Sequence, residues 1–301
     1  MDANERSGIL IINKHAGVTS HDIVGKVRRL YGTKQVGHTG TLDPMATGVL
    51  PVLVGRAVKA SDFIMADKKR YCAVLRLGIE TDTEDTTGSV IRKSEKIPTE
   101  SEVMRVCASF VGEIKQVPPM YSAIKIGGRK LVDIAREGGE VEREARDIVI
   151  YSLTAERLTD TDYRLDVSCS KGTYIRTLCA DIGRALGCGG AMASLMRTES
   201  GCFSLSDSVT VDEIEKMSED EKTARLIPIE RFFADLPEVG LSDFYSRLSR
   251  NGCEIYLKKI GAHFPVGQRV RLTHGGGFYA LGEVCNYPDG DAIKTLKLFV
   301  L

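Results

Sequence analysis

The chain has 301 residues, of which 43% are hydrophobic and 27% charged, a composition typical of a globular protein with a sizeable core. No apolar run approaches the roughly 20 residues that cross a bilayer, and the N-terminus MDANERSGIL is polar, so we expect no membrane segment, no signal peptide and a cytoplasmic location. Basic and acidic residues number 41 each, which on total charge alone argues against a nucleic-acid partner.

The first 112 residues alternate between apolar runs and helical patterns. GILIINK (8–14) predicts a buried strand, and SHDIVGKVRRLYG predicts a helix with Ser20 as N-cap and Gly32 as its stop. The segments that follow are interpreted as a strand or buried turn (49–55), a helix (56–65), a strand followed by a Thr/Asp loop (70–88), and a helix (98–112). The last of these opens with a capping box of Thr99 and Glu102.

Residues 116–147 contain a Pro-Pro break, a Gly-Gly turn, several bases and a short amphipathic pattern, so we predict an inserted hairpin and arm. Two strands (147–158 and 162–170) and a helix ending at Gly187 follow. This irregular order favours an α+β fold with a mixed sheet over a doubly wound parallel one. After a boundary between 230 and 241, short β-rich runs with Gly-rich turns predict a small barrel.

The positions of the charged residues and the cysteines add to what the total charge and composition indicate. VDEIEKMSEDE (211–221) collects acidic residues, whereas bases gather at 26–29, 68–70 and 124–130, so a neutral total can conceal a basic face. Each basic run taken singly is equally compatible with solvated surface. The eight cysteines form no C-x-x-C pair and the five histidines no H-x-x-H pair, which argues against structural zinc and predicts cysteines that act as small core hydrophobes.

GHTGTLDPMATGVLPV (37–52) admits three interpretations. A phosphate-binding loop would end in Gly-Lys-Ser/Thr, which is absent, and a structural turn would use Asp43 only as a cap. In an active-site loop, Pro44 would keep Asp43 extended and outward-pointing, with an ionised carboxylate able to act as nucleophile or base. Glycines on either side would let a bulky substrate approach the backbone. Spacing alone does not decide among these interpretations.

Four segments in this order resemble the bacterial TruB family of tRNA pseudouridine synthases, namely GILIINKHAGVTSHDIV, GHTGTLDPMATGVLPV, KRYCAVLRLGIETDTED and CSKGTYIRTLCADIG. The resemblance covers roughly residues 8–203, and the C-terminal segment looks like the PUA-type RNA-binding barrel that this family often carries. It implies a pseudouridine synthase fold with a mixed, largely antiparallel sheet flanked by helices, plus a PUA-like barrel. The implied domains are a catalytic one (1–235), with the arm at about 116–147, and an RNA-binding one (241–301).

The resemblance also implies roles for individual residues. Asp43 matches the catalytic aspartate, Arg176 the arginine that pairs with it, and Tyr71 the tyrosine that stacks on the extracted base. Four further positions match substrate-binding residues: Tyr174 and Leu195 around the base, His38 in the T loop of tRNA, and Asp85 in the loop used against that T loop.

The implied reaction converts the T-loop uridine at tRNA position 55 to pseudouridine after base flipping, with the tRNA T stem-loop as partner. The reaction contains no redox step or hydrolysis, so neither a metal nor an organic cofactor is implied, nor is a protein partner, and we expect a monomer. His15, Met196 and Cys202 depart from residues common in the family, and none of them has a proposed chemical role. An alternative is a tRNA-folding chaperone with little or no catalysis. A second is the RNA-guided archaeal or eukaryotic relative, which the short C-terminal domain argues against.

Overall fold

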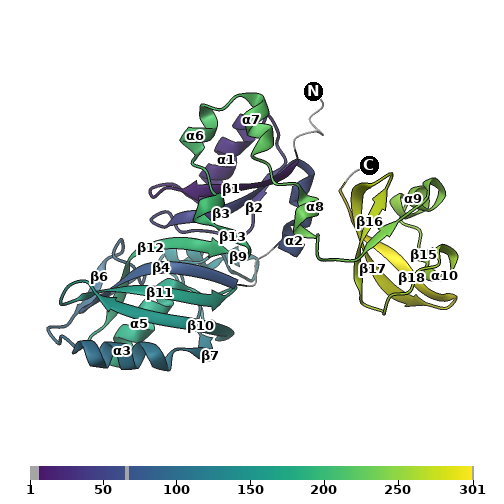
Figure 1. Ribbon diagram of the computed structural model, residues 1–301. Coiled ribbons are helices and arrows are strands. Elements are labelled where there is room, and N and C mark those ends of the chain that lie inside the picture. Colours follow the sequence, from purple (N-terminus) through teal and green to yellow (C-terminus); the bar gives the residue numbers. More distant parts are fainter. Residues whose placement is uncertain (1–6, 65–67, 300–301) are drawn as a thin grey trace.

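The computed structural model describes residues 7–64 and 68–299 of the chain (Figure 1). The first six residues of the polar N-terminus and the end of the predicted 56–65 helix lie outside this part. Instead of one helix, the structure has a 3-10 helix η1 (Gly55–Ala60) and a short helix α2 (Ser61–Ile64). Across the two described ranges, no helix has the length and apolar character needed to span a membrane.

The main sheet has nine strands within the described ranges, in the order β1-β3-β12-β4-β11-β10-β7, with β2 also on β3 and β13 also on β12. Their bounds are β1 (Gly8–Lys14), β2 (Val36–His38), β3 (Thr47–Val54), β4 (Lys68–Leu77), β7 (Gly112–Gln116), β10 (Arg146–Arg157), β11 (Asp162–Ser170), β12 (Gly190–Ser200) and β13 (Phe203–Ser204). Among the described strand pairs of this sheet, only β3 and β12 run parallel, over the pairs Met196–Thr47 and Arg197–Gly48. The predicted α+β class with a mixed, largely antiparallel sheet is confirmed.

Strand β1 explains the uninterrupted apolar run near the N-terminus. Leu10 and Ile12 belong to the main hydrophobic core, whereas Ile9 and Ile11 belong to a second core on the other face. Because successive strand residues point to opposite faces, a strand covered on both sides must be apolar at every position. The β1 end of the sheet is therefore fully buried.

Helices cover this sheet in two groups (Figure 1). One group is α3 (Glu100–Ser109) with α5 (Ile175–Leu186), and the other is α1 (Ser20–Leu30) with α6 (Val211–Glu215) and α7 (Glu219–Ala224). The Thr99 capping box and the helix end at Gly187 are confirmed, the latter at φ 72°. The predicted N-cap of α1 is wrong by one residue, because Thr19 caps it by bonding Asp22 in both directions.

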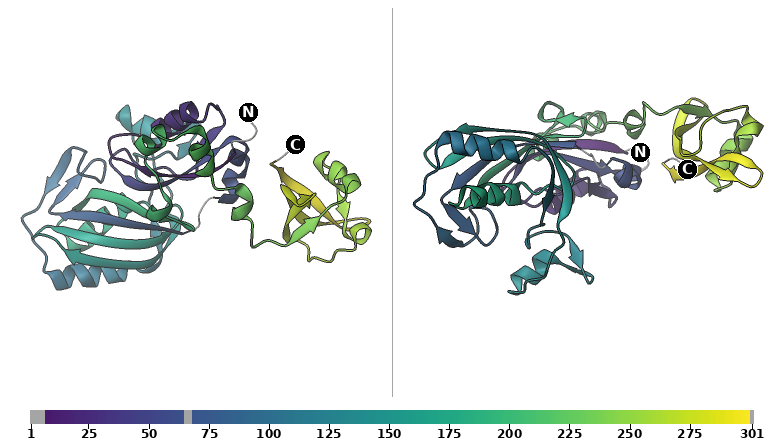
Figure 2. Two further views of the ribbon diagram at one scale, coloured as in Figure 1. Left: turned by 45° about the horizontal axis from the view of Figure 1, so that its top comes forward. Right: turned by 90° about the horizontal axis from the view of Figure 1, so that it is seen from below.

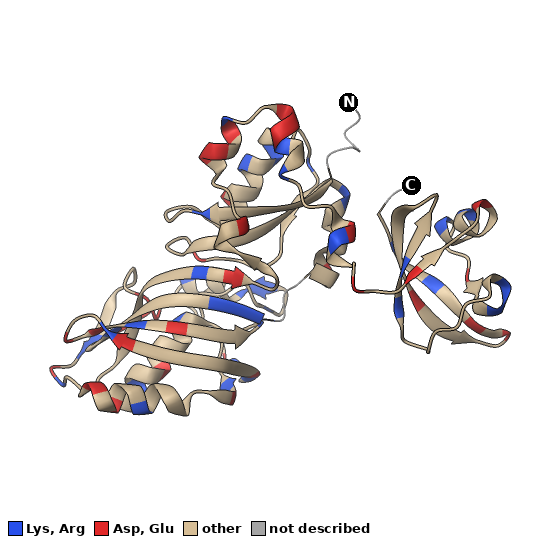
Figure 3. Ribbon diagram, in the orientation of Figure 1, with Lys and Arg blue, Asp and Glu red and all other residues tan. Residues whose placement is uncertain are grey.

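The acidic run 211–221 forms α6 and α7, where Figure 3 shows Asp and Glu concentrated. Each helix begins with a capping box, Thr210 with Glu213 and Ser218 with Glu221. Several of these acids therefore satisfy the unpaired amides of short helices.

The segment between β7 and β10 contains a hairpin, β8 (Lys125–Ile126) and β9 (Arg129–Lys130), and helix α4 (Leu131–Arg136). Figure 2 (right) shows it standing out from the main sheet. Residues 116–147 hold six bases and six acids, and two ion pairs, Arg129–Glu137 and Arg143–Glu140, lie within it. The arm therefore projects as predicted but has no net positive charge.

A second sheet, of five strands in the described chain, has the order β14-β16-β17-β18-β15 and is flanked by α9 (Asp243–Arg250) and α10 (Leu257–Ile260). Its strands are β14 (Glu238–Gly240), β15 (Ile255–Tyr256), β16 (Arg269–His274), β17 (Gly277–Tyr287) and β18 (Gly290–Leu298). Between α2 and this sheet runs α8 (Ile229–Phe232), followed by Phe233, which packs against Phe63, Phe278 and Phe299. The predicted small C-terminal β-structure is therefore present as a curled sheet with its own core.

The cysteines only partly follow the prediction. Four are buried (Cys107, Cys169, Cys179 and Cys188) and two are intermediate (Cys72 and Cys285). Cys202 and Cys253 are exposed, so the interpretation of all eight as core hydrophobes is wrong at these two positions.

Candidate active site

Asp43 lies in the loop between β2 and β3, and buried polar side chains hold the backbone of this loop by hydrogen bonds. The Lys14 ammonium donates to the carbonyl oxygens of Ala46 at 2.6 Å and of Pro44 at 3.2 Å. The Ser20 hydroxyl accepts from the Leu42 amide and donates to its carbonyl. Because both flanks of Asp43 are bonded to the core, its carboxylate has a restricted position.

Two glycines of the loop, Gly40 and Gly48, have positive φ angles and serve the loop's own backbone. A Cβ on Gly48 would lie 2.2 Å from the carbonyl oxygen of Arg197, and Gly48 has φ +100°, so only glycine lets β3 approach β12 here. Gly40 has φ +128°, and its carbonyl oxygen accepts from the buried Arg197 guanidinium. Gly48 is buried, so the expectation that glycines beside Asp43 let a substrate approach the backbone is wrong at this position.

Arg176 and Asp43 form a two-pronged ion pair, although 133 residues separate them in the sequence. Nε lies 2.9 Å from one carboxylate oxygen, and Nη2 donates to the other at 3.3 Å. Arg176 is the second residue of α5, whose first turn points toward the loop. Such a bidentate pair fixes the orientation of the carboxylate and favours its ionised form.

Two further donors of Arg176 bind backbone carbonyls. Nη1 donates to the Thr83 carbonyl at 3.2 Å and Nη2 to the Tyr121 carbonyl at 2.8 Å. The Arg176 side chain is 6% exposed, whereas that of Asp43 is 33% exposed. The guanidinium is therefore a fixed, buried cation, and the carboxylate is the partner that a ligand can reach.

Burial and the charge of Arg176 have opposite effects on the pKa of the Asp43 carboxyl. Burial raises the pKa of its carboxyl above the ordinary value, and the positive charge of Arg176 opposes this rise. The Asp85 carboxylate adds to the rise, and the Lys14 ammonium opposes it. Arg176 is thus the main group that favours an ionised Asp43.

A hollow of about 410 Å³ opens beside this pair, which is within the size range of small-molecule sites (~300–1,000 Å³). Five predicted site residues line it: Asp43, Tyr71, Tyr174, Arg176 and Leu195. The base of the arm, around Tyr121 and Ser122, contributes another wall.

Strand alternation brings Tyr71 and Leu195 into this hollow. Tyr71 on β4 lies opposite Arg197, and Leu195 on β12 lies opposite Ala73, so all project to one face. Tyr174 is the N-cap residue of α5, and its backbone is held by the Gln116 side chain, which bonds both its amide and its carbonyl.

The two other predicted residues do not line the hollow. His38 ends β2 with its Nδ1 buried and without a hydrogen-bond partner among the described residues, and burial lowers its pKa. Asp85 is only 5% exposed, and its carboxylate accepts from Thr83 and Thr87 and lies 3.9 Å from Arg176. Asp85 is thus turned inward, toward the cation that holds Asp43.

Sequence reasoning missed Lys14, Lys69 and Arg197. Lys14 and Arg197 are fully buried and bond the loop, and Lys69 lines the hollow. The alternation of β4 was a usable signal for Lys69, since it stands two residues before Tyr71. Nothing in the local sequence marks Lys14 or Arg197 as buried.

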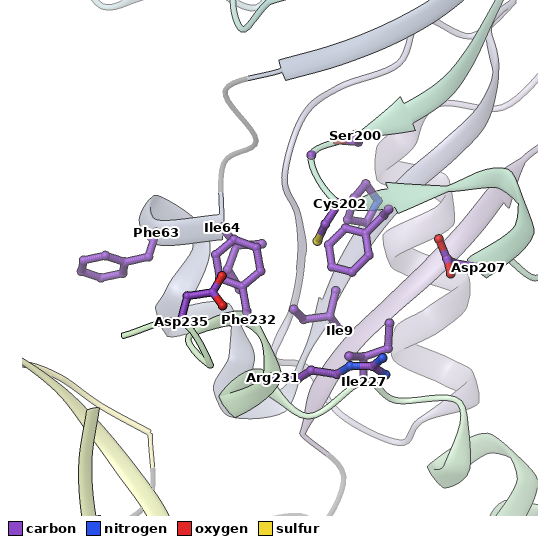
Figure 4. Close-up of a pocket in the computed structure, with 13 residues that line it drawn as sticks. Ile9, Phe63, Ile64, Ser200, Cys202, Asp207, Ile227, Arg231, Phe232 and Asp235 are labelled. Atoms are coloured by element: carbon purple, nitrogen blue, oxygen red, sulfur yellow. The ribbon is translucent and has the colours of Figure 1, made fainter. Parts of the chain in front are cut away.

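A metal cluster or a second hollow would offer other chemistry. In the described ranges, no three His, Cys, Asp or Glu side chains lie in an arrangement that could hold a metal ion. A second hollow, of about 600 Å³, lies between α2, α8 and the turn joining β12 to β13 (Figure 4). Its lining combines apolar side chains with the charged residues Asp207, Arg231 and Asp235, and it includes none of the seven predicted site residues.

Comparison with known families gives two adjoining matches. Residues 28–175 match the family described as TruB family pseudouridylate synthase (N terminal domain). Residues 176–234 match the family described as tRNA pseudouridylate synthase B C-terminal domain. The junction falls between Ile175 and Arg176, so Asp43 and its partner lie in different matches.

Similar proteins extend over nearly the whole chain. A protein of Alkaliphilus oremlandii named tRNA pseudouridine synthase B is 44% identical over 97% of this chain and 98% of its own. One of the same name from Geotalea uraniireducens is 47% identical, covering 97% and 96%. Among solved structures, a Cbf5-Nop10-Gar1 complex contains a chain that is 26% identical, with a TM-score of 0.72 over 99% of this chain and 86% of that one.

Proposed function

Because the chain belongs to the TruB family of pseudouridylate synthases, we propose that it isomerises the T-loop uridine at position 55 of tRNA to pseudouridine, with Asp43 as nucleophile. The observation that carries this proposal is the paired Asp43 and Arg176 beside a hollow lined by Tyr71. A nucleophile, a cation that orients it and an aromatic ring for the base are the parts that this reaction requires.

The reaction rearranges bonds within one nucleotide. The bond between N1 of uracil and C1′ of ribose breaks, the base rotates, and C5 bonds to C1′, while C5 loses a proton and N1 gains one. The Asp43 carboxylate attacks the target nucleotide and holds one fragment covalently during the rotation. This bond breaks again before the product leaves, which restores the free carboxylate. No electron donor or acceptor enters the balance.

The hollow accepts the base after it leaves the RNA stack, which costs the RNA a few kcal/mol. The Tyr71 ring stacks on the base, and Leu195 and Tyr174 complete the apolar wall. Tyr71 is 6% exposed, and burial raises the pKa of its phenol, so the hydroxyl is neutral at physiological pH. His38, outside the hollow, keeps its predicted role of contacting the T loop.

Asp85 is assigned a different contribution from the predicted one. Its carboxylate lies 3.9 Å from Nη1 of Arg176, whereas Asp43 contacts Nε and Nη2, so the two carboxylates share the charge of one guanidinium. Because it is buried, it acts through Arg176, and its predicted contact with the T loop requires the surrounding loop to open.

The partner is the T stem-loop of tRNA, bound by a monomer. Two domains contribute: a catalytic one (1–235), with the arm, and an RNA-binding one whose first strand already begins at Glu238. The tRNA-specific proposal is favoured over an RNA-guided one by 44–47% identity to proteins named tRNA pseudouridine synthase B, against 26% to the Cbf5 complex chain.

The proposal is tested by incubating an unmodified tRNA transcript with the protein and mapping pseudouridine. We expect modification confined to position 55 with the wild-type chain and none with Asp43→Asn, which should still bind the tRNA. Modification at another position, or an active Asp43→Asn, contradicts the assignment. Tight binding without any pseudouridine in the wild type instead supports the tRNA-folding chaperone.

A further inference from the structure

Lys69 is a partly buried cation that the chemistry above leaves unused. It lies on β4 two residues before Tyr71, so both side chains project to the same face and line the hollow beside Asp43. Its neighbours Lys68 and Arg70 are exposed on the other face. Of the three basic residues 68–70, Lys69 is therefore the one that faces the reaction site.

The Lys69 ammonium has no counter-anion in residues 7–64 and 68–299. It makes no hydrogen bond or ion pair there, and burial lowers its pKa to about 8. The charges of Arg197 and Lys171 act in the same direction. The nearby Cys169 thiol supplies no negative charge at neutral pH, because burial raises its pKa to about 11.

Arg197 does not neutralise this site and adds to its positive charge. Its guanidinium is fully buried and donates to the carbonyl oxygens of Val49 and Gly40. In the described chain no carboxylate pairs with it. The Lys69 ammonium and Arg197 Nη1 lie 3.4 and 3.6 Å from the point where a Cβ on Gly40 would stand. Two cations thus converge at Gly40, and of the two Lys69 lines the hollow.

We propose that the Lys69 ammonium binds a backbone phosphate next to the target uridine, at the edge of the hollow. The inference rests on the proposed function, because the RNA strand is what brings an anion to this place. Placing a cation in a desolvated position without a partner is costly, and a bound phosphate offsets this cost with a charge-assisted hydrogen bond. Lys69 would then fix the strand while Asp43 acts on the nucleotide.

The test measures how tightly an RNA hairpin with the tRNA T-arm sequence binds to the parent protein and to Lys69→Met. Both proteins also carry Asp43→Asn, so that the RNA is not converted. Lys68→Met is the matched control, since it removes the adjacent charge from the opposite face. We expect Lys69→Met to weaken binding about tenfold or more and Lys68→Met about twofold or less. The slope of log affinity against log salt should fall by about one unit for Lys69→Met.

Neutral methylphosphonates, placed singly at the phosphates flanking the target uridine, identify the partner. At one position, binding by the parent protein should weaken as much as the lysine change does, and Lys69→Met should cause no further loss. If the loss from Lys69→Met persists on every neutral-phosphate RNA, or if it equals that of Lys68→Met, the inference is wrong.

The melting temperature of the free protein distinguishes a structural role of Lys69 from phosphate binding. If the ammonium supports the Gly40 loop, Lys69→Met lowers the melting temperature of the free protein, which contradicts the inference. A phosphate-binding cation predicts an unchanged or higher melting temperature, because an unpaired charge is removed. Failure of the proposed function is separate, since it shows as a lack of pseudouridine with the wild-type chain.

Discussion

Arg197 lies directly opposite Tyr71 across the antiparallel pair of β12 and β4. One is a fully buried cation and the other a phenol lining the hollow beside Asp43. Burial raises the pKa of the Tyr71 phenol, and the charge of Arg197 opposes this rise. The pair therefore links the wall of the hollow to the loop that Arg197 bonds at Gly40.

Arg197→Met should raise the pKa of Tyr71 further, because burial remains and the opposing charge is lost. The measurement is a pH titration followed by NMR of tyrosine labelled with ¹³C at Cζ, with the Tyr71 signal assigned from Tyr71→Phe. An unchanged or lower pKa would show that Arg197 does not act on the phenol.

Arg176→Ala should reduce turnover by about 100-fold or more while tRNA binding changes much less, because Asp43 loses the cation that orients it. Exposed Arg184 on the same helix, which pairs with Asp181, supplies the control Arg184→Ala. Single-turnover rates and binding constants separate the two effects. An equal loss of binding and turnover would argue against the pairing role.

The pH dependence of turnover should show the raised pKa of Asp43. A nucleophilic carboxylate must be ionised, so the rate falls as the pH drops through this pKa, which burial places above the ordinary value of about 3.9. Since the charge of Arg176 opposes the rise, the acid limb should move to higher pH in Arg176→Ala. A limb that stays in place or moves lower would contradict this electrostatic account.

Lys14→Met should lower the free energy of unfolding at pH 7 by about 1–3 kcal/mol, because the Pro44 and Ala46 carbonyls lose a buried donor. Burial lowers the folded-state pKa of Lys14 to about 8, against an ordinary value of 10.5. The folded chain releases this proton first, so the wild-type advantage should increase as the pH rises from about 8 to 10.5. Urea denaturation at several pH values measures it, and a constant difference would refute the burial effect.

Gly48→Ala should destabilise the protein by at least about 2 kcal/mol more than Gly17→Ala. Both glycines have positive φ, +100° and +86°, so both changes incur the conformational cost. Only at Gly48 would the new methyl group meet the Arg197 backbone, whereas nothing lies within 4 Å of it at Gly17. Equal destabilisation in urea would show that β3 can move away from β12 at little cost.

Local patterns in the sequence predicted much of the fold. β1 was predictable because burial on both faces requires an unbroken apolar run, and the start of α3 because Thr99 and Glu102 form a capping box. The N-cap of α1 was assigned one residue late, since two adjacent hydroxyl residues, Thr19 and Ser20, offer the same signal. The Ser20 hydroxyl bonds Leu42 instead, a contact that depends on tertiary structure.

The site itself depended on the family resemblance, because its parts come together through sheet register. No periodicity connects Asp43 with Arg176, and an arginine on an amphipathic helix ordinarily faces solvent. Asp85 was expected at the RNA surface, yet its carboxylate is buried against Thr83 and Thr87. The side-chain direction in such a loop is set by packing against α5, which sequence spacing does not encode.

The parallel contact of β3 with β12 also determines when, during synthesis of the chain, the Asp43 loop can take its final form. Gly48 is paired to Arg197, and the Asp43 loop reaches its final form only when that late strand is in place. A growing chain on the ribosome therefore carries Asp43, the proposed nucleophile, long before it carries the residues that orient this side chain. We expect the emerging protein to remain inactive toward RNA until nearly two thirds of it has been synthesised, because such non-local contacts form last.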